Sequence, residues 1–226
     1  MTTTERVARP HLKKAYHHGN VRRELVAAAL EIINRSGPQA LTLRAAAKRL
    51  GVTAAAPYRH FANKKALLAA VATEGFTTLL AECRAATDEA GTDPLARYEA
   101  MAVGYVRFGT AHPGHFGVMY GPQVDFGDVA VPERRAALRM LTDAVEACQA
   151  AGIARAGSSR DVANQAWAYA HGLITLYLHG LLHRSIDVPA LIELARDIRV
   201  FLRQPQPDLG RRPRRSSKLA PPRRSR

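Results

Sequence analysis

Histidine side chains are the groups in this sequence best suited to chemistry, because an imidazole can bind a metal or transfer a proton near neutral pH. Five of them fall between residues 112 and 183: His112, His115, His171, His179 and His183. His179 and His183 have the four-residue spacing of a zinc-binding pair on one helix, but no HExxH glutamate lies between them and no third ligand is marked. A helical metal-dependent enzyme therefore stays open as an alternative function.

No motif of a catalytic site accompanies these histidines in the sequence. Nucleophile triads, phosphate-binding glycine loops and paired carboxylates in an apolar setting are all missing. We therefore expect no enzymatic activity, no metal and no cofactor.

The cysteines and the apolar segments indicate where the protein works. Cys83 and Cys148 are far apart and lack CxxC spacing, and the first residues show no apolar stretch of a secretory signal. The longest apolar run, Leu173 to Leu182, is about half of the roughly 20 residues that a membrane span needs, so it indicates a buried core helix. We expect a cytoplasmic protein with no membrane partner.

The net charge of +14 is distributed unevenly along the chain. Residues 1–65 carry a net charge of +10, residues 66–202 of −4 and residues 203–226 of +8. Two basic ends around a mildly acidic middle indicate that an end of the molecule meets a polyanion. Nucleic acid is the leading candidate and an anionic membrane surface the lesser one.

Hydrophobic periodicity predicts an all-α fold, because apolar residues recur at intervals of three and four and the alternation typical of strands is rare. Capping residues, prolines at first helical positions and glycine stops predict where the helices begin and end. The expected helices are residues 20–36, 42–50, a short stretch capped by Thr53, 63 to about 90, 94–111, a short stretch with Phe116 to Met119, 132–151, 159 to about 183, and 187–202. Residues 121–132 are loop-like.

The second and third of these helices, separated by Gly51-Val52-Thr53, have the length and turn chemistry of a helix-turn-helix. Residues 42–71, TLRAAAKRLGVTAAAPYRHFANKKALLAAV, resemble the DNA-binding segment of the TetR family nearly end to end. Tyr58-Arg59-His60-Phe61 and residues 63–68 are similar to the family's aromatic-x-His-Phe and Lys-x-x-Leu-Leu elements, and residues 16–20 resemble a lead-in seen in many members.

The resemblance implies four parts of the chain. They are a basic N-terminal arm (1–19), a three-helix helix-turn-helix DNA-binding domain (20–66), a larger helical domain that senses a ligand and dimerises (67–203), and a tail (204–226). The tail is rich in Pro, Arg and Ser, cannot bury enough apolar surface to offset its ordering entropy, and is predicted to be disordered.

Residue types in the helix-turn-helix predict which side chains bind the DNA backbone. Thr42 and Lys64 lie at helix N-termini, where backbone amides and the positive end of the helix dipole favour a phosphate. Tyr58 and His60 can donate hydrogen bonds to phosphate oxygens. Phe61 should turn inward and hold the third helix against its neighbours.

Base reading is expected from other exposed residues of the same segment. Arg44 could bind guanine, Thr53 could donate or accept at a base edge, and Arg59 could reach either a base or the backbone. Ala54 and Ala55 could contact thymine methyl groups.

Pro57 departs from the family pattern, in which an aliphatic residue usually lies at this position. In a helix capped by Thr53, the missing amide of Pro57 would leave the Thr53 carbonyl unpaired and its ring would crowd that residue. The third helix is therefore expected to start late or to run tight.

The C-terminal part resembles a subfamily whose domain is named for a Trp-x-x-x-His-Gly (WHG) signature, here Trp167, His171 and Gly172. His112-Pro113 with residues 116–120 is also similar to that group. Trp167 and His171 share one helix face, and Gly172 would allow a close helix crossing. In a structural role, the Trp167 indole nitrogen would bond a backbone carbonyl and His171 would be satisfied inside the bundle; contact with a ligand is the alternative.

The resemblance further implies a homodimer in which helices 159–183 and 187–202 pair with those of a second subunit. Their apolar residues exceed what a helix buried on one side requires. These residues are Leu173, Leu176, Tyr177, Gly180, Leu181, Leu191, Leu194, Ile198 and Val200. Such a dimer would bind a roughly palindromic operator in double-stranded DNA.

A small-molecule pocket in the C-terminal bundle is the last implication of the resemblance, with release from the operator on ligand binding and repression as the family's expected mode. Aromatic and methionine side chains there suit a small apolar ligand. The candidates are Tyr105, Phe108, Phe116, Met119, Tyr120, Phe126, Trp167 and His171. A nonspecific DNA-binding protein that relies on its basic ends stays open as a second alternative.

Overall fold

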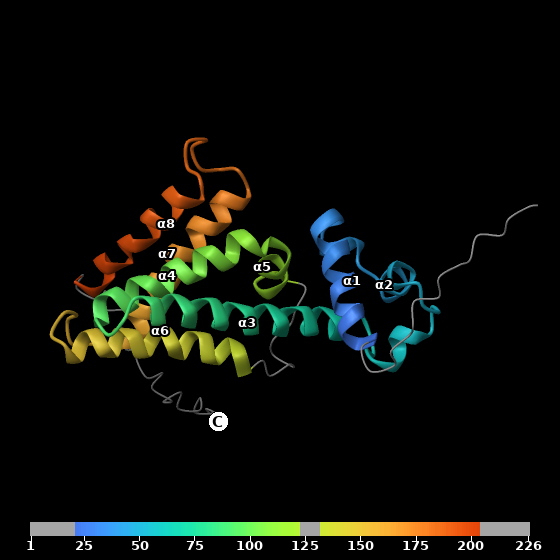
Figure 1. The fold of residues 1–226 in the computed structure, drawn as a ribbon, viewed down its shortest axis with the longest axis horizontal. Coiled ribbons are helices and arrows are strands. Elements are labelled where there is room, and N and C mark those ends of the chain that lie inside the picture. The colour runs from blue at the N-terminus through green and yellow to red at the C-terminus, as the bar shows by residue number, and fades with distance from the viewer. Residues whose placement is uncertain (1–20, 123–131, 204–226) are drawn as a thin grey trace, which may run out of the picture.

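The computed structural model describes residues 21–122 and 132–203, and these are helical with no strand among them. The expected all-α fold is confirmed. Figure 1 shows an elongated molecule in which the long helix α3 (Lys64–Glu89) connects a small N-terminal group of helices to a larger C-terminal bundle. The expected arm, the tail, Asn20 and Phe126 lie outside the described residues.

The N-terminal helices begin and end where local sequence signals predict. α1 spans Val21–Ser36, α2 spans Leu43–Leu50, and a short 3₁₀ helix, η1 (Pro38–Ala40), lies between them. The Thr42 side chain accepts a hydrogen bond from the amide of Ala45 at 3.0 Å, and the Asn63 side chain accepts one from the amide of Ala66 at 3.0 Å. Gly51 ends α2 with φ of 75°, a left-handed conformation that glycine adopts without a side-chain clash.

The third helix starts late and runs tight, as Pro57 led us to expect. It is a four-residue 3₁₀ helix, η2 (Ala56–Arg59), with Ala55 at the N-cap position. The expectation that Thr53 caps it is wrong, because the chain turns first and the Thr53 carbonyl accepts from the amide of Ala56 at 3.0 Å. Pro57 then lies in the first turn, where its missing amide costs no helical hydrogen bond.

The C-terminal bundle consists of α4 (Pro94–Ala111), α5 (Pro113–Met119), α6 (Pro132–Ala150), α7 (Ser159–Leu178), α8 (Val188–Arg196) and the 3₁₀ helix η3 (Asp197–Leu202). Side-chain caps at Asp93, Ser158 and Asp187 start α4, α7 and α8. The last expected helix is thus an α-helix that tightens into a 3₁₀ turn.

The expected continuation of α7 to about His183 is wrong. Gly180 adopts φ of 67°, and the amide of Leu181 donates to the carbonyl of Leu176 at 2.9 Å, which closes the helix with a Schellman-type cap. His179 and His183 therefore do not share a helix face, and His183 Nδ1 lies 2.8 Å from Oγ of Ser185. Within residues 21–122 and 132–203, no group of three or more His, Cys, Asp or Glu side chains is placed to hold a metal ion.

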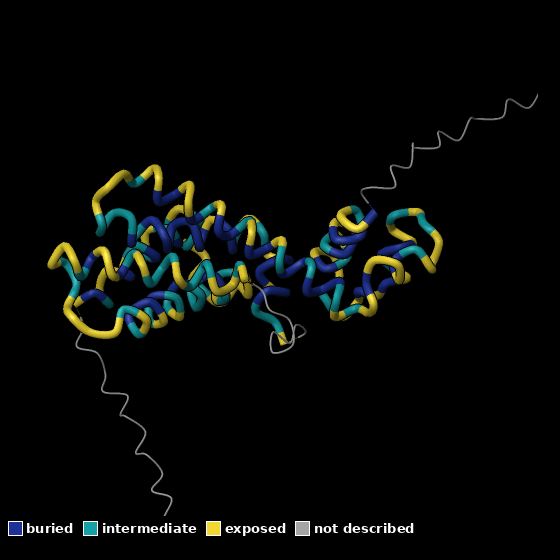
Figure 2. Tube along the Cα trace, turned by 90° about the horizontal axis from the view of Figure 1, so that it is seen from below, coloured by how far each residue is buried: buried dark blue, intermediate teal, exposed yellow. Residues whose placement is uncertain are grey.

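Helix α3 is the central core element of both parts of the molecule. It packs against α1 at its N-terminal end and against α4, α5 and α6 along the rest of its length. It is long and apolar enough to cross a membrane, yet most of that apolar stretch is buried inside the protein (Figure 2). The boundary that we expected between residues 66 and 67 lies inside this continuous helix.

Candidate nucleic-acid interface and effector cavity

The side chains expected to contact DNA come from four consecutive parts of the chain, which are α2, the turn after it, η2 and the start of α3. Thr42 and Arg44 start α2, Thr53 to Ala55 connect α2 to η2, Tyr58 to His60 form η2 and its end, and Lys64 starts α3. All are exposed except Lys64, which is half-buried, and Tyr58 has 53% of its side chain exposed. They are therefore accessible to a macromolecular partner.

Buried residues hold this exposed segment in place. Phe61 is 3% exposed, as expected, and the guanidinium group of Arg22 lies 5.2 Å from its ring centroid. Pro57 is also buried, so η2 rests on the core through Pro57 and Phe61 while Tyr58, Arg59 and His60 face outward.

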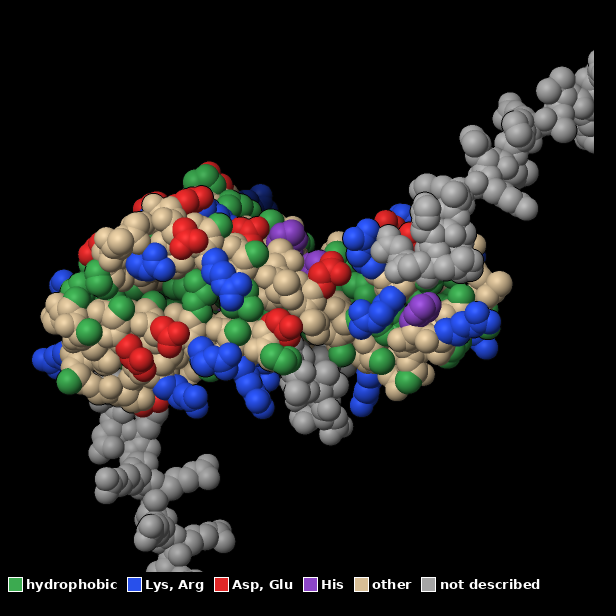
Figure 3. Space-filling model, turned by 60° about the horizontal axis from the view of Figure 1, so that its bottom comes forward, with side chains coloured by type: hydrophobic (Ala, Val, Ile, Leu, Met, Phe, Trp, Pro, Cys, Tyr) green, Lys and Arg blue, Asp and Glu red, His purple; other side chains and the backbone are tan. Residues whose placement is uncertain are grey.

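The N-termini of α2 and α3 carry polar groups suited to an anion. The Thr42 oxygen accepts from Ala45, which leaves the hydroxyl hydrogen as a donor. The Lys64 ammonium group donates to the backbone carbonyl of Gln39 at 3.1 Å, which holds its charge beside the start of α2. Figure 3 shows several Lys and Arg side chains on the surface of this end of the molecule, as well as on the larger bundle.

The larger bundle contains a cavity of about 210 Å³ between α3, α4, α6 and α7. Its walls are mostly aliphatic and aromatic. They consist of Phe76, Leu79, Leu80, Cys83, Met101, Ala102, Tyr105, Tyr120, Arg134, Arg135, Ala137, Leu138, Met140, Leu141, Ala166, Trp167, Ala170 and Ile198.

Three of the expected ligand contacts line this cavity: Tyr105, Tyr120 and Trp167. The others do not, namely Phe108, Phe116, Met119 and His171, and Phe126 lies outside the described residues. Phe108, Phe116 and Met119 are instead buried in the core, and the His171 ring stacks on Phe116 at 4.9 Å. That α6 forms part of the cavity wall was not predicted from the sequence. The two arginines in the first turn of α6 could have indicated a site for an anionic group.

A hydrogen-bonded chain crosses the aromatic end of the cavity. Nε1 of Trp167 donates to Oη of Tyr105 at 3.0 Å, and Oη of Tyr105 lies 2.9 Å from Nδ1 of His171. The expected bond from the indole to a backbone carbonyl is therefore wrong. Burial lowers the pKa of His171, which favours the neutral ring as the hydrogen-bond partner of Tyr105.

Tyrosine ionisation is suppressed in the same region. Burial raises the pKa of Tyr105 well above its ordinary value and that of Tyr120 to about 12. The positive charge of Arg134 opposes this rise of the Tyr120 pKa. Both phenols remain neutral hydrogen-bonding groups at physiological pH.

Helix α5 joins the cavity to the N-terminal helices. Gly114 lies so close to Asn34 of α1 that a Cβ would collide with its side chain, and a Cβ on Gly75 of α3 would lie 2.5 Å from Sδ of Met119. Tyr120, directly after α5, lines the cavity. Tyr120 is thus directly connected to a helix that packs against α1.

The helix-turn-helix at one end and the larger helical bundle at the other define a two-part class of helical DNA-binding protein. Residues 25–71 match the family described as bacterial regulatory proteins, tetR family, and residues 98–197 match the tetracyclin repressor-like C-terminal domain. The chain belongs to the TetR family of regulators. The narrower assignment to a WHG group stays a prediction.

Individual relatives agree with this assignment. A protein of unknown function from Rhodococcus sp. RHA1 is 35% identical, with a TM-score of 0.74 over 85% of this chain and 100% of that one. The TetR family regulator PfmR from Thermus thermophilus shares the fold, with 17% identity and a TM-score of 0.62 over 79% of this chain and 96% of its own. The tetracycline repressor protein class C of Escherichia coli is 49% identical over 51 residues, which span only 23% of each chain.

Proposed function

We propose that this protein is a sequence-specific DNA-binding transcription regulator that works in the cytoplasm as a homodimer and has no enzymatic activity. The observation that carries the proposal is the helix-turn-helix, in which Gly51 turns the chain and η2 presents Tyr58, Arg59 and His60 to solvent. Such a unit places its second helix in the major groove and its helix N-termini against phosphates.

Phosphate binding in this proposal falls to residues around helix N-termini. Thr42 and Lys64 are held beside the starts of α2 and α3, and Tyr58 and His60 extend from η2 with their donors exposed. These contacts would position the protein without reading sequence.

Base contacts would come from Arg44, Arg59, Thr53, Ala54 and Ala55. Because η2 is only four residues long and Pro57 is buried, exposed residues of the turn before it add to the exposed Tyr58 and Arg59. We therefore assign Thr53, Ala54 and Ala55 to the groove as turn residues.

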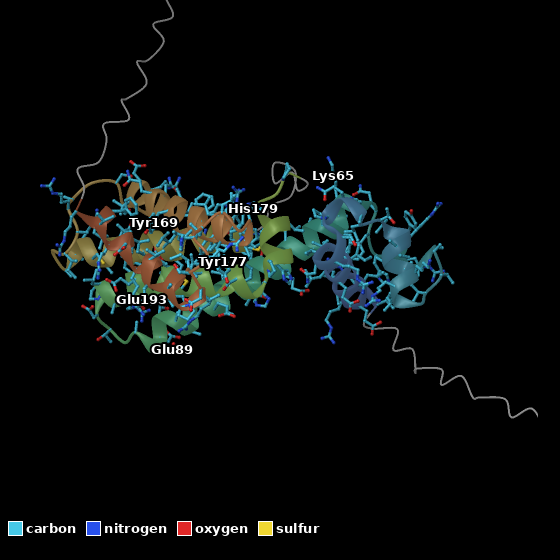
Figure 4. All side chains as sticks on the ribbon, turned by 90° about the horizontal axis from the view of Figure 1, so that it is seen from above. Lys65, Glu89, Tyr169, Tyr177, His179 and Glu193 are labelled. Atoms are coloured by element: carbon cyan, nitrogen blue, oxygen red, sulfur yellow. The ribbon has the colours of Figure 1, made fainter. Side chains whose placement is uncertain are left out.

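A second copy of the chain would bind the face formed by α7 and α8. Leu176 and Val200 are 41% and 46% exposed. A Cβ atom added to Gly172 would contact none of the described residues within 4 Å. The close crossing that Gly172 permits is thus open to a partner. Figure 4 shows Tyr169, Tyr177 and His179 along α7, next to Glu193 of α8.

The apolar face available to a second subunit is smaller than the apolar residues in the sequence of the last two helices implied. Leu191 and Ile198 are 0% and 1% exposed in the single chain, so they belong to its own core and cannot contact a partner. The dimer would rest on α7 and on the exposed residues of α8 and η3.

Binding of a small apolar ligand in the cavity would release the operator, and repression is the regulatory mode that fits this response. The support is the path from Tyr120 through α5 to α1, which contains the close contact between Gly114 and Asn34, while Gly75 lets α5 pack closely on α3. Closely packed elements transmit a displacement because they resist compression.

The test is fluorescence-anisotropy binding to DNA upstream of the protein's own gene against scrambled DNA of equal length, at low and near-physiological salt. A preference that persists at the higher salt, with two subunits bound, supports the proposal. Equal binding that collapses with salt would call for a random-sequence selection, and a selection without enrichment would establish a nonspecific DNA binder instead.

A further inference from the structure

We infer that the effector is a small organic acid, with one apolar ring or short chain inside the cavity and a carboxylate held by Arg134 and Arg135. This inference rests on the proposed ligand-sensing function and names the chemical class that the cavity selects. It depends on the charge, the size and the hydrogen-bonding groups of the cavity wall.

The charge of the wall is one-sided. Arg134 and Arg135 are the charged residues among the described residues that line the cavity, and no Asp or Glu is among them. Both arginines are exposed, so they lie on the solvent side, while Leu79, Cys83 and Ala170 line the interior. An anion at that position gains two cationic partners and keeps part of its hydration, which a fully buried carboxylate would lose.

The size of the cavity limits the apolar part of the ligand. Its volume of about 210 Å³ is below the range of about 300–1,000 Å³ typical of sites for drug-sized ligands. The aromatic walls at Phe76 and Trp167 and the aliphatic walls at Leu79 and Leu141 suit a single ring or a short alkyl chain.

The hydrogen-bonding groups of the wall also favour a ligand whose carboxylate lies beside Arg134 and Arg135. The Tyr105 hydroxyl already forms hydrogen bonds with both His171 and Trp167, so its bonding partners lie within the protein. Tyr120 and Arg134 both line the cavity, and the neutral Tyr120 hydroxyl can donate a hydrogen bond to a carboxylate held by the guanidinium groups. Arginine binds a carboxylate through two parallel N–H donors, which distinguishes an acid from an alcohol of the same shape.

Trp167 provides a direct measurement of occupancy, because it lines the cavity and is the single tryptophan of the chain. We would titrate the full-length protein with two matched series and follow Trp167 emission. One series is octanoate, 1-octanol and octylamine, and the other is 3-phenylpropionate, 3-phenylpropanol and 3-phenylpropylamine.

We expect at least one acid to bind about tenfold or more tightly than its alcohol, since a charge-assisted hydrogen bond is roughly twice as strong as a neutral one. The amines should bind most weakly. In the double variant Arg134→Gln/Arg135→Gln, the acid should lose this advantage while the alcohol keeps its affinity. Lys at both positions, which retains charge but not the paired donors, should give an intermediate preference.

The matched control is Arg139→Gln, because Arg139 is an exposed arginine on the same helix that does not line the cavity. Arg139→Gln should leave the affinities for all compounds of both series unchanged. Melting curves would verify that every variant folds. Should the double variant fail to fold, Arg135→Gln alone replaces it, with a smaller loss of acid preference expected.

Alcohols that bind as tightly as acids, or an acid preference that survives loss of both arginines, would overturn the inference and leave ligand sensing intact. Failure of all six compounds to change Trp167 emission would overturn it as well. Operator binding, measured by anisotropy without any ligand, tests the regulator separately, so the two failures are distinguishable.

Discussion

The Tyr105 hydroxyl on α4 accepts a hydrogen bond from the Trp167 indole on α7, with 3.0 Å between Oη and Nε1. This bond joins two helices across the wall of the cavity. Because Tyr105 is 8% exposed, water has little access to replace the bond if it is lost.

Tyr105→Phe should therefore destabilise the fold by about 1–3 kcal/mol, since it removes the hydrogen-bond partner of the partly buried Trp167 indole N–H and of His171 together. Urea unfolding followed by circular dichroism would measure the loss. Tyr58→Phe is the control, because that hydroxyl is on the exposed side of η2, and its midpoint should match that of the wild type. Equal midpoints for all three proteins would contradict a structural role for the Tyr105 hydroxyl.

Arg44→Ala and Lys64→Ala should weaken DNA binding in different ways. Loss of a base contact at Arg44 should cost about 1–3 kcal/mol on the preferred site and relax the preference at one position. Loss of a phosphate contact at Lys64 should weaken binding to all DNA sequences alike. It should also reduce the slope of log affinity against log salt concentration by about one. Anisotropy against a panel of single-base variants of the site, at several salt concentrations, separates the two.

The control for both is Arg160→Ala, an exposed arginine at the start of α7, far from the helix-turn-helix in the chain. It should bind as the wild type does. A uniform loss for Arg44→Ala would assign that residue to the DNA backbone instead.

Leu176→Arg should convert the dimer to monomers without unfolding the subunit. Leu176 is 41% exposed in the single chain, so a charge there is tolerated in the monomer but would be unpaired in an apolar interface. Sedimentation or light scattering at micromolar concentration would give the mass. Ala81→Arg, at an exposed position of α3, should remain dimeric, and a monomeric wild type would refute the dimer itself.

Acidification should destabilise the joint between α5 and α3 through His115. Burial lowers the pKa of His115 from 6.5, and His112 adds to this effect, while Glu74, whose Oε1 lies 3.4 Å from Nε2, opposes it. Because the folded state binds a proton less readily than the unfolded state, stability is full above about pH 6.5 and falls as the pH decreases toward the folded-state pKa.

Thermal melting between about pH 7.5 and pH 5.5 would test this window. His115→Asn should lose less stability over that interval than the wild type, whereas His183→Asn, in an exposed position, should follow the wild type. Parallel pH profiles for His115→Asn and the wild type would show that other groups cause the acid sensitivity.

Local signals predicted much of the fold correctly, because a cap or a turn depends on a few neighbouring residues. Thr42, Gly51 and Asn63 each perform the role that their type and position imply. The end of α7 was predicted wrongly because the apolar run continues through Leu181 and Leu182 and hid the stop at Gly180.

The cavity was harder to predict than the helices. Hydrophobic periodicity identifies the buried face of each helix, but whether facing side chains fill the space between them depends on packing in three dimensions. Phe116 and Met119 were thus assigned to a pocket although they close the core, and Arg134 was overlooked although it lies at the opening.

The 26 residues of α3 form an uninterrupted rod about 39 Å long that starts shortly after η2 and runs along the larger bundle to an exposed end at Glu89. A tilt of only about 5° at the bundle end would carry the other end by about 3 Å, close to the 3.4 Å between successive base pairs. In a two-fold dimer the two rods would swing in opposite senses, so the mismatch with paired half-sites doubles. A ligand would then need only to tilt α3 slightly at the bundle end. The helix-turn-helix would move as a rigid body, without any change in its own structure.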